Sequence, residues 1–324
     1  FHFYAPKRPD RAPEPLPAAG DSQQARPTDP AALSQEVPSD AAEGDVGGWP
    51  SLPPQAGDDT AVEDVSIKDE YLRLVFTPIG GRLKRAYVIL KTYGADEVEL
   101  VPQPPQGVPD TQAIYPLGLR FTHKGLGDAL DRRLFTVERD LTGRRVTFSL
   151  TMADKAIVRK SFWLDERPYV LNTSVAYENI ASGPEVLGQD NTPAFSLKWG
   201  PNVSSGDLKK GVRQGIYWRK DGQIENKDTA KMKAPAPGTL FTMAVPEPDW
   251  VAIKSAYFVV AMKPNFDKAR MWTQGLPEQF RVGLSFPRFE VEPGQTQGAA
   301  WTLYVGPSQL STLSSAWDTL PEVL

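Results

Sequence analysis

The residues that could carry out catalysis are few in this sequence, and they are not spaced for it. Its 324 residues include no cysteine, which excludes disulfides, thiolate metal sites and cysteine nucleophiles. Its two histidines, His2 and His123, are far apart in the chain, so no pair or triad of imidazoles has the spacing of a metal site. We therefore expect no catalytic, cofactor-binding or metal-binding residues, and no cofactor.

Glycines, serines and carboxylates supply no clear catalytic motif either. A Gly-Xaa-Ser-Xaa-Gly elbow is absent, and Gly80-Gly81 and Gly125-Leu126-Gly127 follow no phosphate-binding pattern, so we interpret both as turns. The 40 Asp and Glu residues lie mostly at turns and on the polar sides of predicted strands, where a carboxylate is usually a solvated charge. A glycosidase that uses two carboxylates stays open as an alternative.

Composition indicates a soluble and mostly globular chain. A hydrophobic content of 40% over 324 residues can bury a sizeable core. The formal net charge is −4, with acidic and basic residues interspersed, so nucleic-acid binding is not expected. No run of about 18 apolar residues is present, so nothing in the sequence predicts a membrane-spanning helix.

Period-two alternation of apolar and polar residues predicts many strands and little helix. The stretch 249–264 is the most informative, because alternation around Trp250 is followed by the β-branched and aromatic run 257–260 and is stopped by Pro264. We expect strands at 65–67, 71–76, 82–90, 134–139, 145–151, 156–164, 169–178, 194–199, 212–218, 250–262 (one or two strands), 280–286 and 300–305.

These strands favour two stacked antiparallel sheets, because a single open sheet rarely exceeds about ten strands. Short turns at 141–143 and 165–168 join the strands between residues 134 and 178, which predicts an antiparallel meander. The fold class expected from the sequence is therefore mainly β, a large β-sandwich formed by residues 61–307.

The first sixty residues have a different composition. Residues 1–60 are rich in Pro and Ala and lack hydrophobic periodicity, so we expect a disordered tether that is stiffened by its prolines. The aromatic cluster Phe1-His2-Phe3-Tyr4 is typical of a membrane interface, and we interpret it as following a missing first transmembrane helix. An aromatic tag on a disordered tail is the alternative.

One helix is expected, at residues 308–324. Ser308 is a candidate N-cap, and apolar residues recur at spacings of three and four before Pro321. The structural interpretation, which we favour, is that this stripe packs on the sandwich. The functional interpretation is that it also faces a partner or a membrane surface, or leads toward a second transmembrane segment. The residues of the stripe are Leu310, Leu313, Trp317 and Leu320.

The sequence resembles a known family in several collinear segments. Residues 65–68 and 72–86 resemble the opening strands of the large periplasmic domain of YidC, the bacterial membrane-protein insertase, in which a strand ends in a Gly-Gly turn. Residues 250–252, 257–258, 291–295 and 303–307 resemble the last strands of that domain and the Gly-Pro entry to its C-terminal helix. The resemblance extends over residues 62–324.

The resemblance implies a β-supersandwich similar to galactose mutarotases, with a C-terminal amphipathic helix, on the periplasmic side of the bacterial inner membrane in a multi-pass protein. It implies a non-catalytic domain of an insertase and chaperone, in contact with SecD, SecF and other Sec translocon components and with nascent membrane proteins, and with the membrane surface through its termini. The insertase activity of the family resides in later transmembrane helices, and one loop histidine cannot supply the catalytic set of a mutarotase.

Two other functions stay open. A carbohydrate-binding or carbohydrate-modifying protein is suggested by the same fold likeness and by the 8 Trp and 10 Tyr residues, because sugar sites favour aromatic platforms beside polar groups. Trp199, Tyr217 and Trp218 are the candidate cleft aromatics. A position in the core or in the lining of the cleft is favoured for each of them over aromatic contact with a bound chain. A pure spacer is the third possibility. The sequence does not indicate which surface binds partners.

Overall fold

The computed structural model of the protein describes residues 55–57, 62–91, 96–122, 126–153, 155–189, 191–204, 214–236, 238–277 and 279–324. His2, His123 and most of the predicted tether lie outside the described residues. Within the range predicted as tether, Gln55 forms a β-bridge with Arg133 and the Ala56 N–H donates to the Arg132 carbonyl at 3.0 Å. The segment 55–57 therefore packs on the folded part.

The largest element of the fold is an antiparallel nine-stranded sheet, which we call the large sheet. It contains the predicted meander, because β6, β7, β8 and β9 pair in sequence order. In spatial order its strands are β13 (Gln223–Asp228), β12 (Gly215–Lys220), β15 (Trp250–Lys254), β16 (Phe258–Pro264), β20 (Thr296–Pro307), β9 (Val170–Asn179), β8 (Ala156–Leu164), β7 (Arg145–Met152) and β6 (Thr136–Arg139).

Three smaller antiparallel sheets complete the strands described. A five-stranded sheet has the order β14 (Phe241–Pro246), β17 (Arg270–Leu276), β18 (Gln279–Phe286), β11 (Phe195–Trp199) and β5 (Gly118–Phe121). A four-stranded sheet has the order β1 (Val65–Lys68), β2 (Leu72–Thr77), β3 (Arg82–Leu90) and β4 (Asp96–Glu99), and a two-stranded ribbon pairs β10 (Glu185–Leu187) with β19 (Phe289–Val291).

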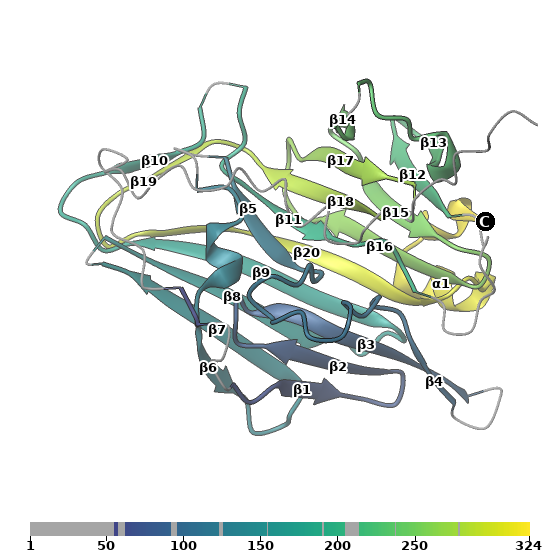
Figure 1. Cartoon of the computed structure of the whole chain (residues 1–324), viewed down its shortest axis with the longest axis horizontal. Coiled ribbons are helices and arrows are strands. Elements are labelled where there is room, and N and C mark those ends of the chain that lie inside the picture. Colours follow the sequence, from purple (N-terminus) through teal and green to yellow (C-terminus); the bar gives the residue numbers. More distant parts are fainter. Residues whose placement is uncertain are drawn as a thin grey trace, which may run out of the picture.

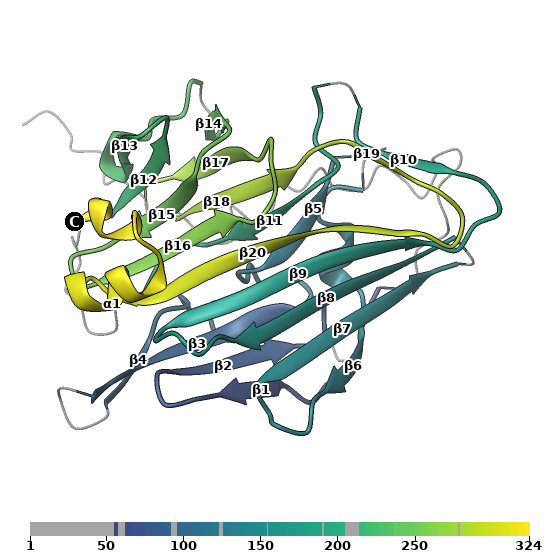
Figure 2. The same cartoon turned by 180° about the vertical axis from the view of Figure 1, so that it is seen from behind.

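The four-stranded and five-stranded sheets both pack against the large sheet. Phe76 of β2 stacks on Phe162 of β8 with ring centres 4.7 Å apart, and Phe195 of β11 meets Trp301 of β20 at 6.2 Å. In Figures 1 and 2 the four-stranded sheet lies toward the bottom and the five-stranded sheet toward the top, while the large sheet passes across both. The result is the two-layered, mainly antiparallel architecture expected from the sequence.

Alternation explains why this layering forms. In β7 the burial pattern is strictly alternating, with Val146, Phe148, Leu150 and Met152 buried, because successive side chains of a strand point to opposite faces. In β11 all five residues are buried, because further residues cover its outer face as well. Burial of this contiguous apolar core is the main favourable term for folding.

The C-terminal segment is less helical than predicted. The helix α1 is Leu310–Ala316, its N-cap is Gln309 rather than Ser308, and no side chain caps it. The backbone of Trp317 is extended, and a 3-10 helix follows at Leu320–Val323. The range 308–324 is therefore one short α-helix plus a 3-10 turn, at the end of the molecule opposite the β10–β19 ribbon (Figure 2). Two further 3-10 helices are Ala129–Arg132 and Thr229–Lys231.

Candidate binding site

A hollow of about 430 Å³ lies over the five-stranded sheet. All five strands of that sheet or their flanking residues contribute to it. We call it the sheet hollow and define it by the residues used below: Arg120, Ser196, Arg270, Trp272, Gln274 and Ser285. Its volume lies within the usual range of small-molecule sites, about 300–1,000 Å³.

Strand register brings these residues onto one face. Ser196 of β11 lies opposite Arg120 of β5 on one side and opposite Ser285 of β18 on the other, and Ser285 lies opposite Arg270 of β17. These four residues therefore form one row across the sheet. Because side chains at i and i+2 share a face, Trp272 and Gln274 extend the same surface along β17.

Two hydroxyls form a buried floor at the centre of this row. The Ser196 and Ser285 side chains are hydrogen-bonded to each other, with their oxygens 2.9 Å apart, and each residue is 2% exposed. A pair of serine hydroxyls keeps further donor and acceptor capacity after one mutual hydrogen bond. The floor can therefore exchange hydrogen bonds with a polar ligand.

Trp272 lies against the sheet because its cross-strand neighbours are small. It is opposite Gly283 on β18 and Ala244 on β14. A Cβ atom at Gly283 would lie 2.4 Å from the indole ring, closer than any normal contact. Gly283 thus makes room for the indole, and the sequence signal for this is the alternation of Arg270, Trp272 and Gln274 along β17.

The two arginines of the sheet hollow are not neutralised by ion pairs. Arg120 donates one long hydrogen bond to the Gln274 amide oxygen, at 3.4 Å, and its guanidinium lies 5.8 Å from the centre of the Trp272 ring. Arg270 donates to the Asn191 carbonyl at 3.3 Å. No carboxylate of the described residues lies within 4 Å of either guanidinium, in contrast to Arg73, Arg159 and Arg219.

A buried ionic cluster borders the sheet hollow on the same face. Lys198 of β11 pairs with Asp128 at 2.7 Å and Asp131 at 2.8 Å, and Arg281 of β18 lies 3.4 Å from Asp128. Burial would raise the pKa of Asp128, but Lys198, Arg281 and Arg120 outweigh it and lower that pKa. The Asp128 carboxyl is therefore ionised at neutral pH and unsuited to donate a proton.

Gly118 allows the segment that carries these aspartates to dock on β5. A Cβ atom at this position would lie 2.4 Å from the Asp131 carboxylate and 2.7 Å from the Lys198 side chain. Asp131 also accepts a hydrogen bond from the Leu119 N–H at 2.9 Å. The 3-10 helix Ala129–Arg132 thus covers one part of the face, and the sheet hollow occupies the part beside it.

A second buried cation lies deeper, between the layers. Lys160 of β8 is fully buried and donates to the carbonyls of Gly80 and Leu117 at 2.8 and 2.7 Å. Burial lowers the pKa of Lys160 to about 7, and the nearby Asp131 opposes this shift. Burial also lowers the pKa of Arg82, which donates to the Ile79 and Ala113 carbonyls.

The three aromatic residues predicted to line a cleft lie elsewhere. Trp199 and Trp218 are buried in the core, and Trp199 donates its indole N–H to the Asn202 carbonyl at 3.0 Å. Tyr217 is half-buried on β12, with the Lys254 ammonium 5.7 Å from its ring centre. None of the three lines the sheet hollow, where the aromatic residue is Trp272.

Three of the four residues of the C-terminal stripe are in the core. Leu313 and Leu320 are fully buried and Trp317 is 8% exposed, while Leu310 is 63% exposed. The stripe therefore packs on the sandwich, which corrects the interpretation of Leu313, Trp317 and Leu320 as residues that face a partner or membrane. Leu310 alone keeps a surface that another molecule could reach.

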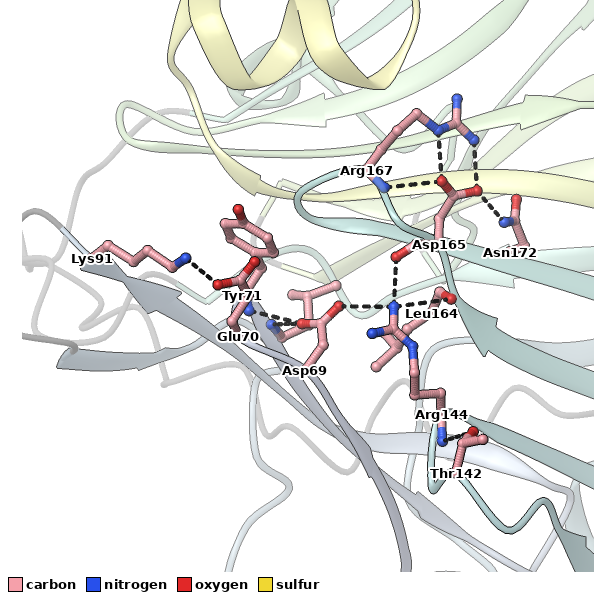
Figure 3. Close-up of polar contacts among 11 residues, drawn as sticks. Asp69, Glu70, Tyr71, Lys91, Thr142, Arg144, Leu164, Asp165, Arg167 and Asn172 are labelled. Atoms are coloured by element: carbon pink, nitrogen blue, oxygen red, sulfur yellow. Dashed lines mark hydrogen bonds and ion pairs between the residues drawn. The ribbon is translucent and has the colours of Figure 1, made fainter.

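The turn between β8 and β9 is joined to neighbouring elements by polar contacts, and Figure 3 shows those that Asp165 makes with Arg167, Asn172 and Arg144. The Arg167 guanidinium donates to both carboxylate oxygens of Asp165 at 2.8 Å and to the Ala316 carbonyl at 2.6 Å. The hydrogen bonds from Arg167, with one more from Asn172, lower the pKa of Asp165. Arg144 joins the same turn to the four-stranded sheet, since it donates to the Asp165 carbonyl at 2.9 Å and lies 3.8 Å from Asp69.

The chemistry that this geometry supports is binding rather than proton transfer. No Asp or Glu of the described residues lines the sheet hollow, so the paired carboxylates of a glycosidase are not found there. The described part of the chain holds no group of three or more metal-ligand side chains. None of its helices has the length and hydropathy of a membrane span.

Comparison with protein families gives one match, which covers most of the chain. The family model described as the YidC periplasmic domain matches residues 64–323. No curated protein sequence matches the chain.

Several solved structures have a similar fold. An aldose epimerase homologue from C. elegans has 9% identity and a TM-score of 0.50, with 76% of this chain and 99% of that chain covered. A galactose mutarotase related enzyme from Lactobacillus acidophilus has 13% identity and a TM-score of 0.47, covering 75% and 97%. A GH36 α-galactosidase from Geobacillus stearothermophilus has 9% identity and a TM-score of 0.46, covering 79% and 41%. At these identities the likeness concerns the fold alone.

Proposed function

Because the chain belongs to the YidC periplasmic domain family, we propose that it is the non-catalytic periplasmic domain of a membrane-protein insertase and chaperone at the bacterial inner membrane. Its role is to contact Sec translocation components, SecD and SecF among them, and substrate chains. The family match over residues 64–323 is the observation that carries this proposal.

The edge strand β6 is the surface that best fits such contacts. It pairs with β7 on one side only, and all four of its residues are exposed. An edge strand offers unpaired backbone groups to an extended chain, and this gives sequence-tolerant binding. Exposed apolar side chains accompany the edge: Leu134, Val137 and Leu141.

The register of β6 explains why an added strand would gain apolar contacts there. Val137 lies opposite Phe148 of β7, which is fully buried, so Val137 is on the core side of the sheet and yet 38% exposed. A chain that pairs with β6 would bury its own side chains beside Val137. Both edge strands of the large sheet carry charged side chains, which disfavour pairing: Glu138 and Arg139 on β6, and Glu225, Lys227 and Asp228 on β13. The edge at β6 differs because Val137 and Leu141 are exposed apolar side chains there.

Adding positive charge to this edge should weaken the contacts. The double variant Val137→Lys with Leu141→Lys is expected to reduce co-purification of SecD and SecF with the full-length insertase about tenfold, because a lysine on an edge strand disfavours pairing. Ile224→Lys on β13 is the matched control, and it should change the co-purification of SecD and SecF less than twofold. If the original protein, the double variant and the Ile224→Lys control all co-purify the same amount of SecD and SecF, β6 is not the contact surface.

A further inference from the structure

We propose that the sheet hollow binds an acidic saccharide, with the sugar ring on Trp272 and the carboxylate between Arg120 and Arg270. This site is independent of the edge-strand contacts and does not require them. It is suggested by a juxtaposition on one sheet face: two guanidiniums without carboxylate partners, one aromatic platform and a floor of hydroxyl groups.

Charge is the first argument. Arg120 and Arg270 contribute two positive charges to the lining, and no described carboxylate lines the hollow. Asp128 forms ion pairs with Lys198 and Arg281 and attracts Arg120 only from beyond ion-pair distance. Both guanidiniums can therefore still form a direct ion pair with a ligand carboxylate, and Arg binds carboxylates through short, charge-assisted hydrogen bonds.

Only weak contacts hold the Arg120 side chain in the hollow when no ligand is bound. Its side chain crosses two intervening strands, β11 and β18, to reach β17. There it makes a 3.4 Å hydrogen bond with Gln274 and lies 5.8 Å from the Trp272 ring centre. Both contacts are long for their kind, so a carboxylate can replace them at little cost.

The remaining lining distinguishes a saccharide from a simple anion. Trp272 packs against Gly283 and lies opposite Ala244, and its indole lines the hollow, where a sugar ring can stack on it. The Ser196 and Ser285 hydroxyls provide donors and acceptors that suit a polyhydroxylated ligand. An apolar or purely anionic ligand would leave these buried hydroxyls without new partners.

Titration calorimetry of the folded domain with digalacturonic acid tests the proposal. We expect saturable binding at least about tenfold tighter than that of neutral digalactose with the same linkage, because digalactose forms no ion pair. Trialanine, which has a carboxylate but no sugar ring, is the second comparison and should bind at least about tenfold more weakly. Equal affinity for digalactose would refute the charge argument, and equal affinity for trialanine would refute the saccharide class.

The chain offers a matched control pair for the variants. Arg145 lies 5.2 Å from the ring of Trp163 on the large sheet, outside the sheet hollow. Arg120→Gln and Trp272→Ala should each weaken digalacturonic acid binding about tenfold or more, whereas Arg145→Gln and Trp163→Ala should change it less than twofold. Uniform loss in all four variants, or no loss in any, would overturn the site.

One more variant separates binding from folding. Gly283→Ala keeps every polar group of the hollow but places a Cβ atom where the indole now lies, so it should abolish binding while circular dichroism and thermal unfolding stay close to the original protein. Retention of full affinity in a folded Gly283→Ala protein would contradict the role of Trp272. If the saccharide does not bind but β6 still captures SecD and SecF, only the inference about the hollow fails.

Discussion

Replacing Lys160 by methionine is expected to destabilise the domain by about 2–4 kcal/mol near pH 9, because two buried carbonyl groups lose their donor. The Lys160 ammonium or amine donates to Gly80 and Leu117 at 2.8 and 2.7 Å in a site without solvent exposure. Methionine has a similar length but no hydrogen to donate. The cost is therefore that of unsatisfied acceptors, not of a cavity.

The pH dependence of stability should reveal the same lysine. Its pKa of about 7 in the folded protein is below the ordinary value of 10.5, so between these values the unfolded chain holds one more proton than the folded one. The free energy of unfolding then rises with pH, by at most about 1.4 kcal/mol per pH unit. Burial raises the pKa of Tyr115 and Tyr304, so above pH 10 their titration acts in the opposite direction.

Urea denaturation between pH 6.5 and 9.5 measures this effect. The original protein should gain stability across that interval, and Lys160→Met should gain less, because it lacks the titrating group. Lys68→Met is the control, since the Lys68 side chain is 57% exposed, and it should follow the original protein. Identical pH profiles for Lys160→Met and the original protein would show that Lys160 is charged at all these pH values or is not buried.

Truncating Trp317 to alanine should destabilise the domain by about 3 kcal/mol, whereas truncating Leu310 should change its stability by less than about 0.5 kcal/mol. Both residues belong to the apolar stripe predicted from the sequence. The indole of Trp317 is 8% exposed and its Nε1 atom has no hydrogen-bond partner among the described residues, so its contribution is packing. Leu310 is 63% exposed and loses little on truncation.

The two variants distinguish a packed stripe from one that faces a membrane. Urea denaturation gives the stability, and flotation with anionic vesicles gives membrane association. A packed stripe requires a large loss of stability for Trp317→Ala and a small one for Leu310→Ala. The reverse of this order, or a Trp317→Ala protein of unchanged stability that no longer floats, would place the indole at a membrane surface instead.

Much of the large sheet could be predicted from alternation. The predicted strand 156–164 coincides with β8, and 145–151 and 169–178 differ from β7 and β9 by one residue at their ends. These strands bury one face and expose or half-bury the other, which is the pattern that sequence periodicity detects. The pairing of the meander followed from the short turns between its strands.

The sheet that carries the candidate site was harder to predict. Three of its five strands, β5, β14 and β17, were not expected. In β17 the buried positions are Met271, Thr273 and Gly275, and β5 has only four residues, so neither forms a clear apolar alternation. For the same reason Trp272 was not predicted as a cleft residue, whereas Trp199 and Trp218 were. A sequence shows that a residue is aromatic but not whether neighbouring elements cover the sheet face on which it lies.

The C-terminal stripe shows why spacing alone does not define a helix. Apolar residues recur at helical spacing through Leu320, yet the chain leaves the helix at Ala316, and Trp317 is extended. Leu313 is buried from α1, Trp317 from the extended residue that follows it, and Leu320 from the 3-10 helix. Tertiary packing, with the hydrogen bond from Arg167 to the Ala316 carbonyl, overrides local periodicity here.

Site-specific photocrosslinking in living cells tests the central claim most directly. A photoreactive residue at Val137, on the edge strand β6 of the full-length insertase, is compared with one at Ile224 on the opposite edge strand β13. We predict adducts with SecD, SecF or a nascent membrane protein from position 137 and few or none from position 224. Adducts of equal yield from both positions, or none from position 137 in cells that are actively inserting membrane proteins, would contradict a contact role for this edge.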